Sequence, residues 1–352
     1  MFDRVTTYMS GNKKDLIIKR GTRSVIVKGR IMAAPMAGAL DPPYRIILHE
    51  HGCPMSFTEM ISSRGLVEST DKTLEIIRWD QEWGQCGAQL FGSDPEFMAI
   101  SASELEKKGF PVLDINSGCP KRKVLRGGGG GALMKHPDVL LKCTGNVLDE
   151  VKIPVGVKLR GGWNEKRKRD ILRIADELEG IGISHISVHP RTVRQGYSGN
   201  ADHELTESLS RRVDIPVIAS GDIQNGSEAV SLISKGLDGV MIGRALLGNP
   251  LWFELLGDKG NSGDDPRRIK KMILDVALDH LDRHMRFHST GSPIAKFRKH
   301  ISWYLKGVPG KRRYLERIYR TEDEEEVRDI LIRIRDDLGS ITSEHRVNLP
   351  NF

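Results

Sequence analysis

Eight short apolar runs, separated by helix-like stretches, most constrain how this chain of 352 residues can fold. Most of the runs are unbroken, as expected of parallel strands that are buried on both faces. The predicted strands are residues 30–34, 54–58, 87–91, 112–115, 155–158, 185–189, 217–219 and 239–242. The helix-like stretches are residues 43–51, 95–108, 137–150, 166–180, 203–212 and 227–235. This alternation predicts an α/β protein with a parallel sheet.

Local signals mark the ends of the predicted helices. Pro95 and Pro137 stand where a proline in the first helical turn is tolerated, and Ser227 is predicted to cap its helix. A glycine follows three of the helix ends: Gly109, Gly182 and Gly236. Glycine is the usual residue just beyond a helix C-terminus, so these positions support the predicted bounds.

Eight strands alternating with helices predict a (β/α)8 TIM barrel. A doubly wound sheet is the competing architecture, but it would usually show a Gly-rich dinucleotide loop after the first strand. Here the first strand runs into AAPMAGALD, which contains no GxGxxG. From about residue 258 the chain becomes charged and helix-periodic. We therefore predict a TIM-barrel domain over residues 1–257 and a small all-helical C-terminal domain over 258–352.

Positive charge is concentrated in one segment. The formal net charge is +7, and residues 296–320 alone hold nine Lys or Arg against one Glu, which leaves −1 for the rest of the chain. Tyrosines and a tryptophan are interleaved with these charges. Such a segment suits a polyanion with bases that can stack, although a solvated helix face with long basic side chains is the plainer interpretation.

Several protein classes are disfavoured. No run approaches the ~18 apolar residues of a membrane span, and the first residues lack the apolar stretch of a signal peptide. The four cysteines form no CxxC pair and no Cys/His cluster, so we expect neither a disulfide framework nor a metal site. A cytoplasmic location is the expectation.

In a TIM barrel the active site is built where the strands end. Almost every predicted strand here closes on polar or small residues. These are Pro35-Met36-Ala37-Gly38, Gln89, Asn116-Ser117-Gly118-Cys119, Lys158 and Arg160, His189 with Arg191, Thr192, Gln195 and Tyr197, Ser220-Gly221-Asp222, and Gly243-Arg244. Scattered core residues would not collect at these positions, so we predict a site at this end of the barrel.

Two of these loops suit a phosphate group. Ser220-Gly221 and Gly243-Arg244 follow the seventh and eighth strands, where barrels often hold phosphate on backbone N–H groups. An ordinary turn is the alternative for the first loop. Lys158 ends a buried strand and needs an anion or a polar ligand, with a structural ion pair as the alternative. His189 is ambiguous between a structural role and contact with a cofactor or phosphate.

Cys119 is the most specific single candidate for a catalytic residue. It stands between a glycine and a proline in a loop at the predicted catalytic end. A free thiol with a pKa near ~8.5 stays mostly protonated at neutral pH, which suits a proton donor, and it suits a nucleophile if a base is near. The other cysteines, Cys53, Cys86 and Cys143, are interpreted as small buried apolar residues.

Taken together, these segments resemble the tRNA-dihydrouridine synthase family. The matching stretches are AAPMAG-LD-PYR (33–45), QLFGSDP (89–95), DINSGCPKRKV (114–124), GGGALM (129–134), PVGVKLRGGW (154–163), HPRTVRQGYSGNAD (189–202), IPVIASGDI (215–223), VMIGRALLGNPLWF (240–253) and HISWYLKG (300–307). They cover nearly the whole barrel in the family's order.

The resemblance implies a barrel that holds FMN without a covalent bond. It implies cofactor-binding roles for Pro35, Met36, Ala37, Gln89, Lys158, His189, Ser220, Gly221, Asp222, Gly243 and Arg244. It implies that Cys119 is the catalytic acid and that Asn116, Arg160 and Gln195 lie near the substrate. Lys158 is expected near N1 of the flavin ring.

The implied reaction is reduction of the C5=C6 bond of specific uridines in tRNA. Reduced FMN would deliver hydride to C6, Cys119 would give a proton to C5, and NADPH or NADH would reduce the flavin again. A uridine in folded tRNA must leave its stack to react, and the basic helical domain would hold the surrounding phosphates. We expect a monomer.

This chain departs from the family pattern at two positions. Ser220 stands where the family usually has Asn, and Pro190, which has no backbone N–H, stands where it often has Gly. Two rival interpretations are a non-catalytic RNA-binding protein on a barrel and a flavin oxidoreductase acting on a free metabolite. The first leaves Cys119 and Lys158 unexplained, and the second leaves the basic segment unexplained.

Overall fold

The computed structural model describes residues 15–165, 167–257, 265–288 and 292–338. The chain divides into two compact units. Of the described residues, the barrel unit comprises those in 15–42 and 54–243, and the helical unit comprises those in 43–53 and 244–338. The domain boundary that the sequence predicts at residue 258 lies outside the described residues.

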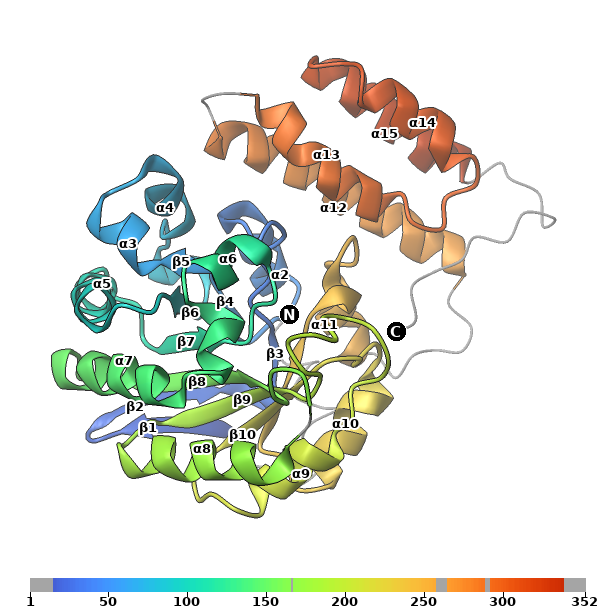
Figure 1. Cartoon of the computed structure of the whole chain (residues 1–352). Helices are drawn as coiled ribbons and strands as arrows, with labels where there is room; N and C mark the ends of the chain where they lie inside the picture. Colours follow the sequence, from blue (N-terminus) through green and yellow to red (C-terminus); the bar gives the residue numbers. More distant parts are fainter. Residues whose placement is uncertain (1–14, 166, 258–264, 289–291, 339–352) are drawn as a thin grey trace. The chain divides into compact units, whose positions relative to one another are not determined.

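The barrel unit is built on eight parallel strands (Figure 1). They are β3 (Ile31–Ala33), β4 (Ser56–Phe57), β6 (Cys86–Phe91), β7 (Leu113–Ser117), β8 (Val155–Arg160), β9 (His185–His189), β10 (Val217–Ser220) and β11 (Gly239–Ile242). Their order is β3-β11-β10-β9-β8-β7-β6-β4, with the short β5 (Ile61–Ser62) also on β6. Ala33 N–H donates to the Met55 carbonyl at 2.9 Å, which joins the two ends of this order. The predicted TIM barrel is confirmed.

Helices alternate with these strands. They are α3 (Ser63–Val67), α4 (Asp71–Ile76), α5 (Pro95–Lys107), α6 (Arg122–Arg126), α7 (Pro137–Glu150), α8 (Lys168–Gly180), α9 (Glu204–Ser210) and α10 (Gly226–Ser234), with the 3-10 turns η1 (Lys28–Arg30), η2 (Gln81–Trp83) and η3 (Gly130–Met134). In α8 the buried residues Ile171, Ile174 and Leu178 recur at helical spacing and form its inner face. Sequence periodicity therefore decides which side of the helix is buried.

The ends of the helices follow the predicted signals, with one exception. Pro95 and Pro137 lie in the first helical turn, as expected. The prediction that Ser227 caps α10 is wrong. Asn225 holds the cap position in an extended conformation, and its side chain accepts from Glu228 N–H at 2.9 Å. Because Asn225 reaches the free N–H first, the Ser227 hydroxyl donates to the Asn225 side chain at 2.7 Å instead.

The barrel interior changes from apolar to polar along its axis. Side chains alternate between the two faces of a strand, so residues two apart share the interior face. Val112 in the approach to β7 belongs to a buried apolar cluster, whereas Asp114 and Asn116, two and four residues further, are polar and buried. On β8, Lys158 and Arg160 follow Gly156 in the same way. The polar groups therefore collect at the carboxyl ends of the strands.

An N-terminal hairpin, which the strand prediction did not include, contributes to the apolar end. Its strands β1 (Leu16–Arg20) and β2 (Arg23–Val27) pair antiparallel (Figure 1). The inward residues Leu16, Ile18, Val25 and Val27 belong to the same buried cluster as Met32, Phe57, Val112, Ile218 and Met241 of the barrel. The hairpin thereby closes the amino end of the barrel with apolar side chains.

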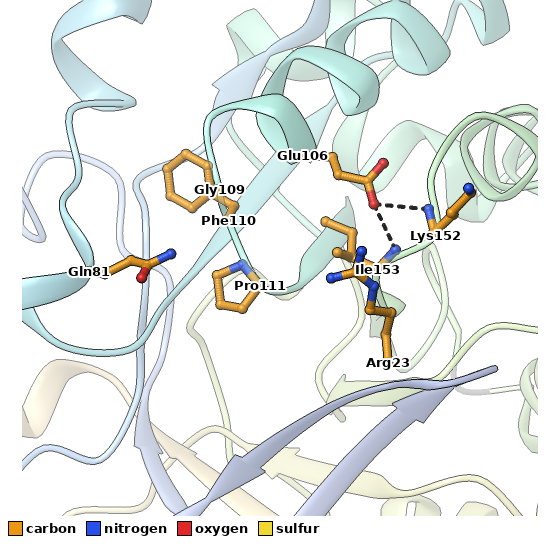
Figure 2. Close-up of a pocket in the computed structure, with 8 residues that line it drawn as sticks. All are labelled: Arg23, Gln81, Glu106, Gly109, Phe110, Pro111, Lys152 and Ile153. Carbon is orange, nitrogen blue, oxygen red and sulfur yellow. Dashed lines mark hydrogen bonds between the residues drawn. The ribbon is translucent and has the colours of Figure 1, made fainter.

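A pocket of about 530 Å³ also lies at the amino end. Its lining includes Arg23, Phe110, Pro111, Lys152 and Ile153, which come from β2 and from the approaches to β7 and β8 (Figure 2). One oxygen of Glu106 accepts from the backbone N–H groups of Lys152 at 3.0 Å and Ile153 at 3.1 Å. The pocket therefore stands at the end of the barrel opposite to the predicted catalytic residues.

The helical unit contains α2 (Pro42–Glu50, assigned from residue 43), η4 (Arg244–Leu246), α11 (Trp252–Gly257), α12 (Pro266–Phe287), α13 (Pro293–Tyr304), α14 (Lys311–Ile318) and α15 (Glu324–Asp337). Helix α12 packs against α13 and α15. The fully buried Lys270 donates to the carbonyls of Tyr304 at 2.6 Å and Lys306 at 2.8 Å, which holds the chain as it leaves α13. Among the described residues, no helix combines the length and the apolar character that a bilayer crossing requires.

Candidate active site

Cys119 lies in the loop after β7, and neighbouring backbone groups fix this loop. The Asn116 side chain accepts from the backbone N–H groups of Gly118 at 3.1 Å and Cys119 at 2.9 Å. The Cys119 carbonyl accepts from Gly131 N–H at 3.0 Å. The residue is 8% exposed, and burial raises the pKa of its thiol above the ordinary value. The thiol is therefore protonated at neutral pH and close to the surface.

Three buried side chains form a row of hydrogen bonds that ends at the Cys119 backbone. Gln89 on β6 donates from Nε2 to Asp114 Oδ2 on β7 at 2.6 Å. Asn116 Nδ2 in turn donates to Gln89 Oε1 at 2.9 Å. These contacts follow from strand register, because Gln89 stands opposite Asp114 across β6 and β7. The predicted residues Gln89 and Asn116 thus meet in one network, which includes an aspartate that sequence reasoning did not single out.

Lys158 presents a buried cation on β8. Its Nζ is buried and has no hydrogen-bond partner among the described residues. Burial lowers the pKa of Lys158 to about 8, and the nearby Asp114 carboxylate opposes that shift. Asn116 stands opposite Lys158 across β7 and β8. A buried ammonium without a partner is costly, so this position suits a ligand that carries acceptor oxygens or nitrogens.

His189 ends β9 and is neutral. Burial, with the positive charges of Arg160, Lys158 and Arg191, lowers the pKa of His189 to about 2. Its Nδ1 is buried and finds no partner in the described part of the chain. The imidazole packs against Gly221, whose φ is +108°, and a Cβ at that position would lie 2.3 Å from the His189 ring. Glycine is therefore required at 221 both by conformation and by space.

Arg191 and Asp222 form a bidentate ion pair beside His189. The guanidinium donates from Nη1 to Asp222 Oδ1 at 2.8 Å and from Nη2 to Oδ2 at 2.5 Å. Ala201 N–H also donates to Asp222 Oδ2 at 2.8 Å. Asp222 itself has a φ of +54°, which is uncommon for a residue with a side chain. The carboxylate thus holds the loop after β9 against the loop after β10.

Arg160 and Gln195 shape the outer rim near Cys119. Arg160 Nε donates to the Gly118 carbonyl at 3.0 Å, and its Nη1 donates to the Gly196 carbonyl at 2.7 Å. Gln195 Oε1 accepts from Thr192 N–H at 2.8 Å. Tyr197, which is 57% exposed, lies with its ring 5.6 Å from the Arg160 guanidinium. Arg160 therefore links the cysteine loop to the 191–199 loop and to an exposed aromatic ring.

Trp163, in the loop after β8, is a second aromatic residue at this end that sequence reasoning did not single out. The Lys135 ammonium lies 4.2 Å from its ring centre and the Arg194 guanidinium 5.6 Å from it. Arg194 N–H also donates to the Trp163 carbonyl at 2.9 Å. The only signal in the sequence was its position five residues after Lys158. An indole between two exposed cations offers both stacking and positive charge.

The loops after β3 and β11 are adjacent. A Cβ at Gly243 would lie 3.7 Å from Met36 Sδ, so this glycine leaves ordinary contact space beside the methionine. Pro35 and Met36 are half-buried, Ala37 is exposed and Ser220 is buried at the end of β10. Arg244 begins η4 and belongs to the helical unit. Apart from Arg244, all of the predicted site residues belong to the barrel unit.

Comparison with known proteins matches residues 32–337 to the family model described as dihydrouridine synthase (Dus). The chain is 35% identical over 286 residues to tRNA-dihydrouridine synthase B of Pasteurella multocida, covering 80% of this chain and 85% of that protein. It is 34% identical over 315 residues to a probable tRNA-dihydrouridine synthase of Rickettsia bellii, covering 88% of this chain and 95% of that protein.

Solved structures share the fold at low sequence identity. The old yellow enzyme homologue from Zymomonas mobilis has a TM-score of 0.51 at 14% identity and covers 70% of this chain and 93% of its own. Morphinone reductase in complex with tetrahydroNAD has a TM-score of 0.52 at 13% identity and covers 73% and 94%. The fold is thus common to several kinds of protein, whereas the family match spans the barrel and most of the helical unit. On that match, this chain belongs to the dihydrouridine synthase family.

Proposed function

We propose that this protein is a flavin-dependent enzyme that reduces the C5=C6 bond of uridine in tRNA. One observation carries the proposal: a protonated thiol, Cys119, lies at the same end of the barrel as buried polar atoms of Lys158 and His189 that have no hydrogen-bond partner within the described residues. A packed, ligand-free core rarely keeps such atoms. The family membership and the names of the relatives specify the reaction.

The residues present fit FMN. Lys158 offers a buried cation, Gln89 an amide and His189 a neutral imidazole, which together suit the polar edge of a flavin ring. The small residues Ser220, Gly221 and Gly243 of the barrel unit suit its phosphate. The family resemblance assigns Arg244, whose guanidinium is a good phosphate donor, the same role. Pro35, Met36 and Ala37 would pack against the ring. Asp222 would contribute by holding its loop, because both of its oxygens already accept from Arg191.

When bound, the flavin supplies the hydride that adds to C6 of the uracil, and NADPH or NADH would be its reductant. Cys119 gives its Sγ proton to C5. A thiol suits this task because burial keeps it protonated at neutral pH. Asn116 fixes the loop that carries the thiol, and Arg160 fixes the same loop from the other side. Gln195 holds the 191–199 loop that flanks the base.

For tRNA, we propose two contact regions. On the barrel unit, Trp163 and Tyr197 would stack with unpaired bases, with the nearby cations on phosphates. On the helical unit, the basic segment 296–320 would bind phosphates. Lys311, Arg312 and Arg313 at the start of α14 are exposed there. Arg312 and Arg317 pair with Glu316 and Glu326, both at 3.1 Å, in exposed ion pairs that phosphate can replace.

The activity is tested by mass analysis of tRNA nucleosides from a strain that lacks the gene. Loss of dihydrouridine at specific positions, restored by the wild-type gene and not by Cys119→Ala, is the expected result. Unchanged dihydrouridine in the deletion strain would refute the proposed substrate. A purified protein that is colourless and takes up no FMN at micromolar concentration would refute the proposed cofactor.

The tRNA contact is tested separately by charge reversal. Lys311→Glu with Arg313→Glu should weaken tRNA binding and lower the slope of log affinity against log salt by roughly 0.7–0.9 for each lost phosphate contact. The matched control is Lys142→Glu with Arg211→Glu, which reverses two exposed charges on α7 and after α9. An unaltered slope in the first variant would mean that RNA is held elsewhere, with Lys121, Arg122 and Lys123 next to be tested.

A further inference from the structure

The buried carboxylate of Asp114 has no part in the chemistry proposed above, yet it begins a chain of hydrogen bonds that ends at Cys119. The residue is 0% exposed and is the second residue of β7. Asp114 Oδ2 accepts from Gln89, Gln89 accepts from Asn116, and Asn116 accepts from Cys119 N–H. The three distances are 2.6, 2.9 and 2.9 Å, so the link to the carboxylate is short and the other two are hydrogen bonds of ordinary length.

The carboxylate gives this chain a single direction. An ionised carboxylate can only accept, so Gln89 must turn its NH₂ group toward Asp114 and its oxygen toward Asn116. Asn116 must then present its NH₂ group to Gln89 and its oxygen to the backbone of Gly118 and Cys119. With an apolar residue at 114, both amides could turn over and the oxygen that holds the cysteine loop would be lost.

The surroundings of Asp114 also argue against a purely structural role. Its other oxygen, Oδ1, is buried and has no hydrogen-bond partner within the described residues. His185 Nε2 lies 3.9 Å from that oxygen, beyond hydrogen-bond distance, and burial lowers the pKa of His185 to about 4, so the imidazole is neutral. Burial raises the pKa of Asp114 to about 6, and the hydrogen bond from Gln89 and the charge of Lys158 oppose that shift, so the carboxyl group is ionised above that pH. An apolar side chain of this shape would pack here at lower cost, since burying a carboxylate is unfavourable.

We propose that Asp114 is a positioning residue, whose carboxylate sets the amide orientation of Gln89 and Asn116 and thereby fixes the backbone that carries the Cys119 thiol. The importance of this position for catalysis rests on the proposed function of Cys119. The positioning itself is a property of the backbone and is measurable without activity.

Amide hydrogen exchange of the purified protein, followed by mass spectrometry, tests the proposal. The useful peptide spans residues 116–121, in which Pro120 has no amide, so that the Gly118 and Cys119 amides weigh heavily. Asp114→Leu keeps the branched shape and removes the acceptor, and it should speed exchange of these amides about tenfold. Asp114→Asn keeps one acceptor oxygen and should stay within about twofold of the wild type.

The backbone amides of Lys152 and Ile153, which Glu106 holds, are the internal reference. They should exchange at wild-type rates in both variants. Unchanged exchange at 118–119 in Asp114→Leu, or equal acceleration at 152–153, would overturn the proposal. If Asp114→Leu does not fold, Gln89→Leu cuts the same chain one step later and carries the same expectation. Because no arm uses uridine reduction, a wrong assignment of Cys119 would leave these results interpretable.

Discussion

The two ends of the barrel use their polar groups in opposite ways. At the amino end, one oxygen of Glu106 serves two backbone N–H groups. Toward the carboxyl end, Lys158 Nζ and His189 Nδ1 are buried without hydrogen-bond partners in the described part of the chain. The first arrangement lowers the free energy of the folded chain, and the second raises it until a ligand arrives. The difference separates residues that stabilise the folded barrel from residues whose polar groups are available to a ligand.

The largest expected effect is a loss of uridine reduction when the Cys119 thiol is removed. Cys119→Ala should lower uridine reduction about 10²- to 10⁴-fold, the usual contribution of a general acid, while flavin content stays at the wild-type level. Cys143→Ala is the matched control, because Cys143 is a fully buried thiol on α7 and should tolerate the change without loss of rate. Single-turnover kinetics on tRNA measure both. Equal rates of uridine reduction in the two variants would show that Cys119 is not the proton donor.

The next effect compares two glycines with positive φ. Gly221→Ala at the carboxyl end forces a Cβ to within 2.3 Å of the His189 ring at φ +108°, which should cost about 2–4 kcal/mol in the free energy of unfolding. Gly109→Ala at the amino end, at φ +88°, meets its nearest atom at 3.7 Å and should cost only backbone strain, about 1 kcal/mol. Urea unfolding measures both losses. If the His189 loop is rigid, Gly221→Ala loses more unfolding free energy than Gly109→Ala.

The third effect concerns the loss of stability that the buried Lys158 ammonium causes in the ligand-free protein. Lys158→Met should weaken FMN binding and yet stabilise the ligand-free protein by about 1–3 kcal/mol near neutral pH. The folded-state pKa of Lys158, about 8, is below the ordinary value of 10.5, so the wild type gains stability as pH rises between these values and the advantage of methionine fades. Lys152→Met, at an exposed site of the amino-end pocket, should change neither quantity. Destabilisation of the ligand-free Lys158→Met protein would contradict this account.

The smallest effect concerns Glu106. Glu106→Gln keeps an acceptor oxygen for Lys152 and Ile153 N–H but removes its charge, so the unfolding free energy should fall by about 0.5–1 kcal/mol. Flavin affinity and turnover should not change. An effect on turnover larger than the effect on stability would show that the two ends of the barrel are coupled.

The eight strands could be predicted because parallel strands buried on both faces are unbroken apolar runs, and all eight runs became strands. The β1–β2 hairpin was missed because its short strands are buried on one face only, whereas the barrel strands were recognised as runs buried on both faces. Ser227 was predicted as the cap of α10, but the residue whose side chain reaches the free N–H groups is Asn225, two positions earlier.

The sequence placed the candidate site residues at or just after strand ends, and the structure has them there, whereas their pairings could not be predicted. Gln89 and Asn116 meet through Asp114 because of cross-strand register, which no local motif specifies. The partners of Asp222 were equally hidden, because Arg191 lies 31 positions earlier in the chain. Sequence patterns indicate which end of the barrel holds the candidate site, and only the three-dimensional structure shows which side chains are in contact there.

The hairpin below the barrel has a kinetic consequence. Among the described residues, Leu16, Ile18, Val25 and Val27 fill the amino end of the barrel with apolar side chains. Under the proposed function, a reductant and a nucleobase would then both enter from the carboxyl ends of the strands and would bind in turn. We expect parallel lines in double-reciprocal plots when both are varied, the pattern of a ping-pong mechanism, and mutual competition at high concentration.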